Sequence, residues 1–192
     1  DADASLFTET LIRLPVFNTY RAPTDAPTVS ALPAVRRGYL CFGSFNNPAK
    51  ISARCIAAWA AVLQRVPASR LLLKHRVFDD PAIRTALQDR FGRAGADSQR
   101  IDFSGFTADV PAYLAAYHDV DIALDPMPFS GGTTSYEAIW MGVPVLTAAG
   151  ATPMARQTAS FMYALGHPEF VVPDVEHYAR RAVELAAELA TL

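Results

Sequence analysis

The residues of this chain best suited to chemistry are two glycines followed by two threonines, Gly131, Gly132, Thr133 and Thr134. They open a predicted helix, so free backbone N–H groups and two hydroxyl groups gather at its positive end, where phosphate binds. Glu137, about one turn further on, could hold the hydroxyl groups of a ribose. The segment therefore predicts a site for a nucleoside diphosphate. A flexible turn with a threonine cap, and an acid that complements the helix dipole, are the alternative interpretation.

A lysine in an earlier loop could act on the same phosphate. Lys50 follows the apolar run 39–45 by five residues and stands just before a predicted helix. Its ammonium group could neutralise the charge that builds on a leaving diphosphate. Asn47 could contact a sugar or phosphate, and Tyr113 could stack on a base. Each also has a plainer interpretation, because lysine and asparagine are common in exposed loops and tyrosine in packing contacts.

A parallel sheet would bring these side chains together. Apolar runs alternate with helical patterns and predict strands over 39–45, 70–75, 100–104, 120–124, 144–147 and 169–172. The helical patterns cover 53–66, 81–91, 110–118, 134–141, 153–165 and 175–189. This alternation is typical of an α/β fold, a Rossmann-like parallel sheet with helices on both faces. Ligands of such sheets bind outside the carboxyl ends of the strands, where the loops 46–50, 105–109 and 126–134 are expected.

The chain divides into an irregular N-terminal segment and one domain. Residues 1–38 are rich in proline and are expected to form a linker or interdomain arm, with a short helix near Leu6–Arg13. Residues 39–192 are expected to form the Rossmann-like nucleotide-binding domain. Because the chain begins at Asp1 rather than at a methionine, we expect it to be part of a longer protein.

The composition excludes several classes of function. With 51% hydrophobic and 19% charged residues, the chain can form an ordinary core, and its net charge of −2 gives no reason to expect a nucleic acid or an anionic membrane as a partner. Cys41 and Cys55 are too few for a disulfide framework, and the histidines lack metal-ligand spacing, so no metal is expected. No apolar run is long enough to span a bilayer and no signal peptide opens the chain, so a cytoplasmic location is expected.

Several segments together resemble a known family. These are Phe42–Ile51, Asp121–Asp125, the Gly131–Thr134 segment and Trp140–Val145. In this order and spacing they resemble the C-terminal catalytic domain of O-GlcNAc transferases, most closely the bacterial SPINDLY-like group, over nearly the whole chain. The resemblance implies the C-terminal half of a GT-B glycosyltransferase, an inverting and metal-independent enzyme in which two Rossmann-like domains face each other. Many members carry tetratricopeptide repeats ahead of the catalytic halves.

The resemblance also implies roles for single residues. Lys50 matches the catalytic lysine that stabilises the leaving diphosphate, Thr133 and Thr134 match threonines that hold it, and Asn47 matches a donor contact. The backbone at Thr107 and Ala108 matches the segment that reads uracil. Four positions depart from the family pattern: Gly132 for a histidine, Tyr113 for a stacking histidine, Val110 for a lysine, and Glu137 for a ribose-holding aspartate.

The expected function is therefore donor binding in a sugar transfer. UDP-GlcNAc is the default donor and GDP-fucose the variant used by some relatives; no cofactor is expected beyond this substrate. The acceptor, a protein serine or threonine, would be bound by an N-terminal half and repeats that this chain lacks, so the isolated chain is expected to catalyse little. The alternative is a non-catalytic nucleotide-binding or partner-docking scaffold domain, which the departures at Val110, Tyr113 and Gly132 favour.

Overall fold

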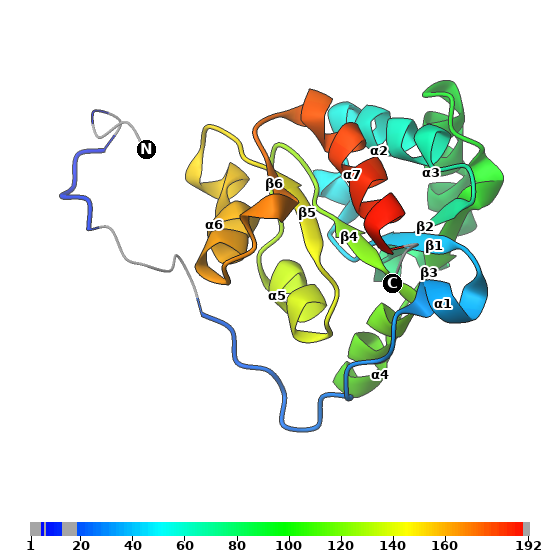
Figure 1. Cartoon of the computed structure of the whole chain (residues 1–192), viewed down its shortest axis with the longest axis horizontal. Coiled ribbons are helices and arrows are strands. Elements are labelled where there is room, and N and C mark those ends of the chain that lie inside the picture. The colour runs from blue at the N-terminus through cyan, green and yellow to red at the C-terminus, as the bar shows by residue number, and fades with distance from the viewer. Residues whose placement is uncertain (1–4, 6, 13–18, 190–192) are drawn as a thin grey trace.

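The computed structural model describes residue 5, residues 7–12 and residues 19–189. At its centre is a six-stranded parallel sheet with strand order β3-β2-β1-β4-β5-β6 (Figure 1). The strands are β1 (Leu40–Ser44), β2 (Ser69–Lys74), β3 (Ile101–Ser104), β4 (Ile122–Leu124), β5 (Val145–Ala148) and β6 (Val171–Val172). The chain first builds outward from β1 to β3 and then returns to place β4 on the other side of β1. The crevice between β1 and β4 is thus the topological switch point, where ligands of such sheets bind.

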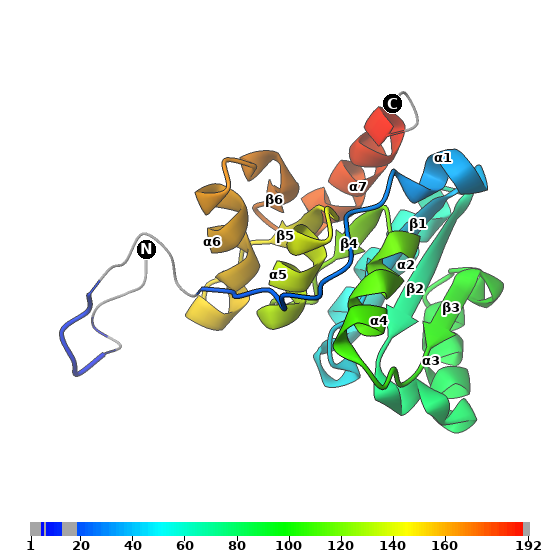
Figure 2. The same cartoon turned by 90° about the horizontal axis from the view of Figure 1, so that it is seen from below.

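Helices cover both faces of this sheet, as predicted (Figure 2). They are α1 (Pro33–Arg37), α2 (Ala53–Arg65), α3 (Pro81–Arg93), α4 (Val110–Ala115), α5 (Thr133–Trp140), α6 (Gln157–Ala164) and α7 (Val175–Leu189). On one face, α2, α3 and α7 bury side chains such as Trp59, Phe91 and Tyr178 in one core. On the other, α4, α5 and α6 contribute Leu114, Ala138 and Met162 to a second core.

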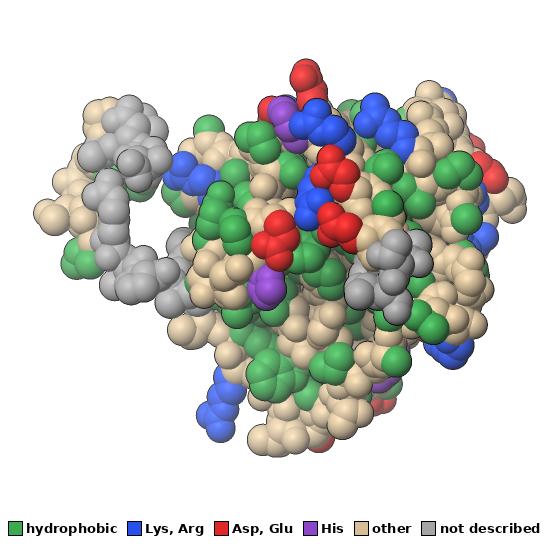
Figure 3. Space-filling view, in the orientation of Figure 1, with side chains coloured by type: hydrophobic (Ala, Val, Ile, Leu, Met, Phe, Trp, Pro, Cys, Tyr) green, Lys and Arg blue, Asp and Glu red, His purple; other side chains and the backbone are tan. Residues whose placement is uncertain are grey.

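The outer face of α7 carries charges of both signs. Arg181 lies 3.1 Å from Glu184 and 2.9 Å from Glu188, one and two turns along the helix. Figure 3 shows blue and red side chains gathered along this helix, with green apolar atoms around them. Ala182 and Leu185 on the opposite side are buried. The helix is therefore amphipathic, with its polar side exposed.

Four predicted elements differ from the structure. The predicted helix 110–118 is α4 followed by a 3-10 turn at Ala116–Asp119. The predicted helix 153–165 begins as a 3-10 turn at Pro153–Ala155, and α6 starts only at Gln157. The first half of the predicted strand 169–172 is part of a 3-10 turn, which leaves only Val171–Val172 paired with β5. The expected short helix near Leu6–Arg13 is absent from residues 7–12; its two end residues lie outside the described residues.

The N-terminal segment packs onto the domain. Residues 19–32 run past α5 and α4 (Figure 2), and the ring of Tyr20 stacks on that of Tyr136 at 5.7 Å. The segment ends in α1, which the sequence analysis missed. Pro33 starts this helix, and Gly38 ends it in a left-handed conformation with φ 73°.

A buried carboxylate joins α1 to the sheet. Asp121, just before β4, is 2% exposed, and its two oxygens accept hydrogen bonds from the backbone N–H groups of Ala34 and Cys41, both at 2.8 Å. Burial raises the pKa of Asp121, and these hydrogen bonds oppose the change. Neither N–H group has another acceptor within its own element, so the carboxylate replaces hydrogen bonds that the start of the sheet cannot supply.

We expect Asp121→Ala to lower the free energy of unfolding by about 2–4 kcal/mol, because it leaves two N–H groups without an acceptor. Urea denaturation monitored by circular dichroism measures the loss. Asp89→Ala, which removes an exposed acid from α3, is the control and should change stability by about 0.5 kcal/mol or less. Equal losses in the two variants would contradict the anchoring role of Asp121.

Candidate functional site

The two predicted phosphate-binding features meet at the switch point of the sheet. Lys50 ends a 3-10 turn that follows β1, and its ammonium donates to the carbonyl of Ser130, in the loop after β4, at 2.8 Å. The ammonium also lies 4.3 Å from the centre of the Phe129 ring. Burial lowers the pKa of Lys50, and the nearby carboxylate of Asp125 opposes that change. The tertiary structure thus places a half-buried cation beside the glycine–threonine segment.

The N-terminus of α5 lies open on the same loop. Gly132 precedes the first residue of the helix and supplies no side-chain cap. Within residues 19–189, none of the amides of residues 132, 133 and 134 donates a hydrogen bond. The Thr134 hydroxyl donates to Asn46 Oδ1 at 2.9 Å, and Thr133 is exposed. The first turn of α5 therefore presents free donors next to Lys50, the arrangement that binds an anion.

A buried acid beneath the loop holds it in this shape. Asp125, at the end of β4, is 1% exposed and accepts hydrogen bonds from the Gly131 amide and the Thr147 hydroxyl, both at 2.7 Å. A Cβ on Gly131 would lie 2.1 Å from Ser135 Oγ and 2.9 Å from Asp125 Oδ1, so a larger residue would displace these side chains. Burial raises the pKa of Asp125 to about 6, although its hydrogen bonds and the nearby Lys50 ammonium act to lower it. No role for Asp125 was predicted from sequence, although an acid directly after an apolar strand was the available signal.

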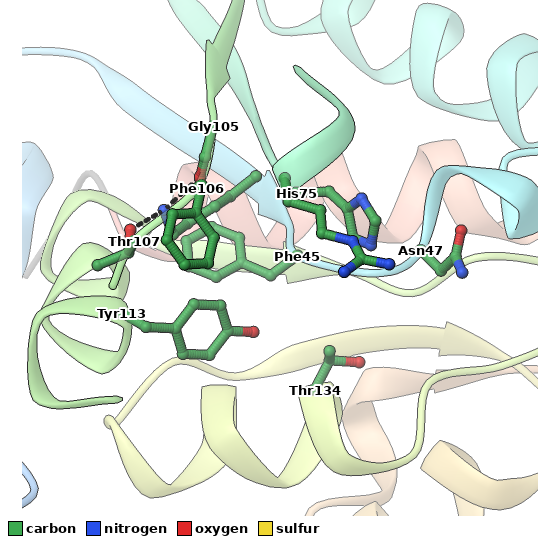
Figure 4. Close-up of a pocket in the computed structure, with 10 residues that line it drawn as sticks. Phe45, Asn47, His75, Gly105, Phe106, Thr107, Tyr113 and Thr134 are labelled. Carbon is green, nitrogen blue, oxygen red and sulfur yellow. Dashed lines mark hydrogen bonds between the residues drawn. The ribbon is translucent and has the colours of Figure 1, made fainter. Parts of the chain in front are cut away.

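A cavity of about 390 Å³ opens beside this loop (Figure 4). Four predicted site residues line it: Asn47, Thr107, Tyr113 and Thr134. The other predicted residues are not part of its lining: Lys50, Ala108, Gly131, Gly132, Thr133 and Glu137. Six further residues complete the lining and were missed: Phe45, Lys74, His75, Arg76, Gly105 and Phe106. The cavity therefore joins the loops after β1, β2 and β3 to the start of α5.

Tyr113 and Glu137, predicted separately, form one unit. The Tyr113 hydroxyl donates to Glu137 Oε2 at 3.0 Å, and the Tyr113 ring packs edge-on against Phe45 with 5.9 Å between ring centres. Burial raises the pKa of both groups. The carboxylate keeps acceptor capacity for other hydroxyl groups, because one hydrogen bond occupies only part of it. In Figure 4 the Tyr113 hydroxyl points along the cavity toward Thr134.

The described residues contain no group of three or more His, Cys, Asp or Glu side chains arranged to hold a metal ion. No helix among them has both the length and the apolar character needed to cross a membrane.

Comparisons with known proteins agree on one family. Residues 31–192 match the model of glycosyl transferase family 41. Over 185 residues the chain is 34% identical to a Petunia hybrida protein named probable UDP-N-acetylglucosamine–peptide N-acetylglucosaminyltransferase SPINDLY, covering 96% of this chain and 20% of that protein. A Caenorhabditis elegans protein named UDP-N-acetylglucosamine–peptide N-acetylglucosaminyltransferase is 31% identical over 150 residues, covering 78% of this chain and 13% of that protein.

One solved structure is also similar to this chain over nearly its whole length. A mutant of the Thermobaculum terrenum O-GlcNAc transferase superposes with a TM-score of 0.87 at 34% identity, covering 97% of this chain and 35% of that chain. The chain thus spans about one fifth of the length of the plant relative and about one third of the bacterial structure.

The buried acid predicts a pH dependence of stability. Its pKa of about 6 in the folded protein exceeds the ordinary 3.8, so between these values the folded state holds a proton that the unfolded chain has released. Stability from this group therefore falls as pH rises through that window. Relative to Asp125→Asn, the wild type should lose up to about 1.4 kcal/mol of unfolding free energy per pH unit between about pH 4 and pH 6.

Urea denaturation of both proteins at pH 4, 5, 6 and 7 measures this difference. Asparagine keeps an acceptor for the Gly131 amide, and Thr147 can turn its hydroxyl to accept, so the variant should fold. A difference between the two proteins that stays constant with pH, or that grows in the opposite direction, would contradict the raised pKa of Asp125.

Proposed function

Because the chain belongs to glycosyl transferase family 41, we propose that it is the donor-binding half of an inverting, metal-independent glycosyltransferase. Its donor is UDP-GlcNAc, and the acceptor of the whole protein is a serine or threonine hydroxyl of a protein. The observation that carries the proposal is the Lys50 ammonium beside the open N-terminus of α5. These two features supply positive charge and hydrogen-bond donors at one place, as a diphosphate requires.

The same geometry supports a mechanism without a metal. As the bond from the sugar to the diphosphate breaks, negative charge grows on the leaving phosphate. Lys50, the amides of residues 132–134 and the Thr133 hydroxyl would stabilise that charge, since donors held by the fold need no reorganisation during the reaction. Inversion requires the acceptor hydroxyl to attack from the side opposite the leaving group. That acceptor would be held by the part of the protein that precedes this chain.

The cavity suits the nucleoside of the donor. Phe45 and Tyr113 offer ring faces and edges for a base, and the exposed Phe106 is also part of the lining. Glu137 could accept from the ribose hydroxyls while it keeps its bond from Tyr113. This arrangement supports nucleotide binding without distinguishing uracil from guanine, so GDP-fucose is the second candidate donor.

Titration calorimetry with UDP in EDTA tests donor binding, with GDP as competitor. We expect UDP to bind without added metal and Lys50→Ala to weaken binding about 10- to 100-fold, since one charge-assisted interaction with phosphate is lost. Arg54→Ala, which removes an exposed cation four residues further on, is the control and should bind as the wild type does. Tighter binding of GDP would redirect the donor to a GDP-sugar, and metal-dependent binding would contradict the mechanism.

Turnover in the full-length parent separates catalysis from scaffolding. There, Lys50→Ala should lower kcat by about 10²- to 10³-fold, as the loss of one transition-state donor does. The transferred sugar should have the anomeric configuration opposite to that of the donor, which NMR of the glycopeptide product determines. Normal turnover in the Lys50→Ala variant would remove the catalytic role, and an inactive wild-type parent that binds UDP would favour the scaffold function.

A further inference from the structure

The loop 105–108 is held from one side by a buried lysine. Lys74 ends β2 and is 3% exposed. Its ammonium donates to Ser104 Oγ at 3.0 Å, to the Gly105 carbonyl at 3.0 Å and to Thr107 Oγ1 at 2.6 Å. An ammonium has three N–H donors, so these three acceptors use all of them. Lys74 therefore lines the cavity with no donor left over for a ligand.

An acid holds the same loop from the other side. The Asp79 carboxylate accepts from the Phe106 amide, with its two oxygens at 3.2 and 3.3 Å. A Cβ on Gly105 would lie 1.7 Å from Asp79 Oδ1, so a side chain at this position would displace the Asp79 carboxylate. Below the loop, the His75 amide donates to the Ser104 carbonyl at 3.0 Å and extends the pairing of β2 with β3.

The loop also contains backbone donors that the described residues leave free, one of them at a residue that lines the cavity. Within residues 19–189, neither the Thr107 amide nor the Ala108 amide donates a hydrogen bond. Thr107 lines the cavity across from Thr134 (Figure 4). The Lys74 ammonium lies 5.8 Å from the centre of the Tyr113 ring. The groups that fix the loop and the groups left to bind are thus different.

Burying the Lys74 ammonium costs desolvation free energy, so a gain in stability does not explain why a lysine is at this position. Burial lowers the pKa of Lys74, while Asp79 opposes the change. An apolar side chain of similar length would avoid the desolvation of a charge. Lys50 and Lys74 are also the only lysines in a chain of 192 residues, and both lie at this edge of the sheet. A compact ammonium can direct its three donors at three oxygens around one point, which a planar guanidinium cannot do.

We propose that Lys74 and Asp79 clamp the loop 105–108 so that its free backbone groups meet the base of the nucleotide. Both are positioning residues for the base, whereas Lys50 acts at the diphosphate. The inference rests on the proposed function, because it takes the ligand to be a nucleotide. It assigns the base to the loop 105–108 and the diphosphate to Lys50.

Three probes distinguish the two ends: uridine, UDP and inorganic pyrophosphate, each titrated calorimetrically into the full chain, with guanosine and GDP in parallel. Lys74→Met keeps the length of the side chain and removes its three hydrogen bonds. We expect it to weaken binding of the nucleoside and the nucleotide at least about tenfold and to leave pyrophosphate binding unchanged. Lys50→Ala should do the reverse, weakening pyrophosphate and nucleotide while the nucleoside binds as before.

A second pair of variants avoids the buried position. Asp79→Asn keeps an acceptor for the Phe106 amide and should bind the nucleoside as the wild type does, whereas Asp79→Ala should weaken it about three- to tenfold. This pair keeps the test decisive if Lys74→Met does not fold. If the charge of Asp79 mattered and its hydrogen bond did not, Asp79→Asn would weaken nucleoside binding as much as Asp79→Ala does.

The outcomes separate this inference from the proposed function. The clamp is overturned if Lys74→Met and Asp79→Ala bind the nucleoside normally, or if they weaken all three probes equally, which is a general structural effect. A wild-type chain that binds neither nucleotide nor pyrophosphate overturns the proposed function itself, and the clamp with it. Selective loss of the nucleoside in both variants supports the clamp.

Discussion

The hydrogen bond from the Gly131 amide to the buried carboxylate of Asp125 is the interaction on which the site depends. It fixes the loop between β4 and α5 at the point where the strand order reverses. With that loop held, the Ser130 carbonyl meets Lys50 and the first amides of α5 stay open to solvent. The Tyr178 hydroxyl on α7 donates to the Leu146 carbonyl at 2.9 Å in the adjacent strand, so the base of the loop is packed from the opposite face.

Three charged side chains are buried at the ends of the strands, where they form hydrogen bonds with backbone groups of neighbouring segments. Asp121 at the start of β4, Asp125 at its end and Lys74 at the end of β2 are all nearly inaccessible, and each has several hydrogen bonds. A buried charge without such partners would be strongly destabilising. The two acids and the lysine interrupt apolar strands at their ends, where the regular ladder of hydrogen bonds stops. These interruptions shape the connections and, through them, the cavity.

The site is divided along its length. Lys50, the glycine–threonine segment and Asp125 surround the position proposed for the diphosphate, and the loop 105–108 with Tyr113 and Glu137 surrounds the position proposed for the nucleoside. They meet at Thr134, which belongs to the glycine–threonine segment and also lines the cavity. The family match over residues 31–192 confirms the resemblance to O-GlcNAc transferases, and the TM-score of 0.87 confirms the predicted fold class. The binding roles of single residues stay predictions.

The sequence by itself determined the kinds of elements and their order, because apolar runs and helical spacing are local patterns that a chain displays whatever it packs against. It also singled out Lys50 and the segment Gly131–Thr134, whose residue types suit phosphate. It failed where short turns replace regular structure, as at 153–155 and 168–170, since proline fits the start of either. Only the tertiary structure decided the roles of Lys74, Asp125 and the Tyr113–Glu137 pair. Their partners lie 6 to 33 residues away along the chain, and contacts at that separation depend on how the strands are ordered, which no local pattern records.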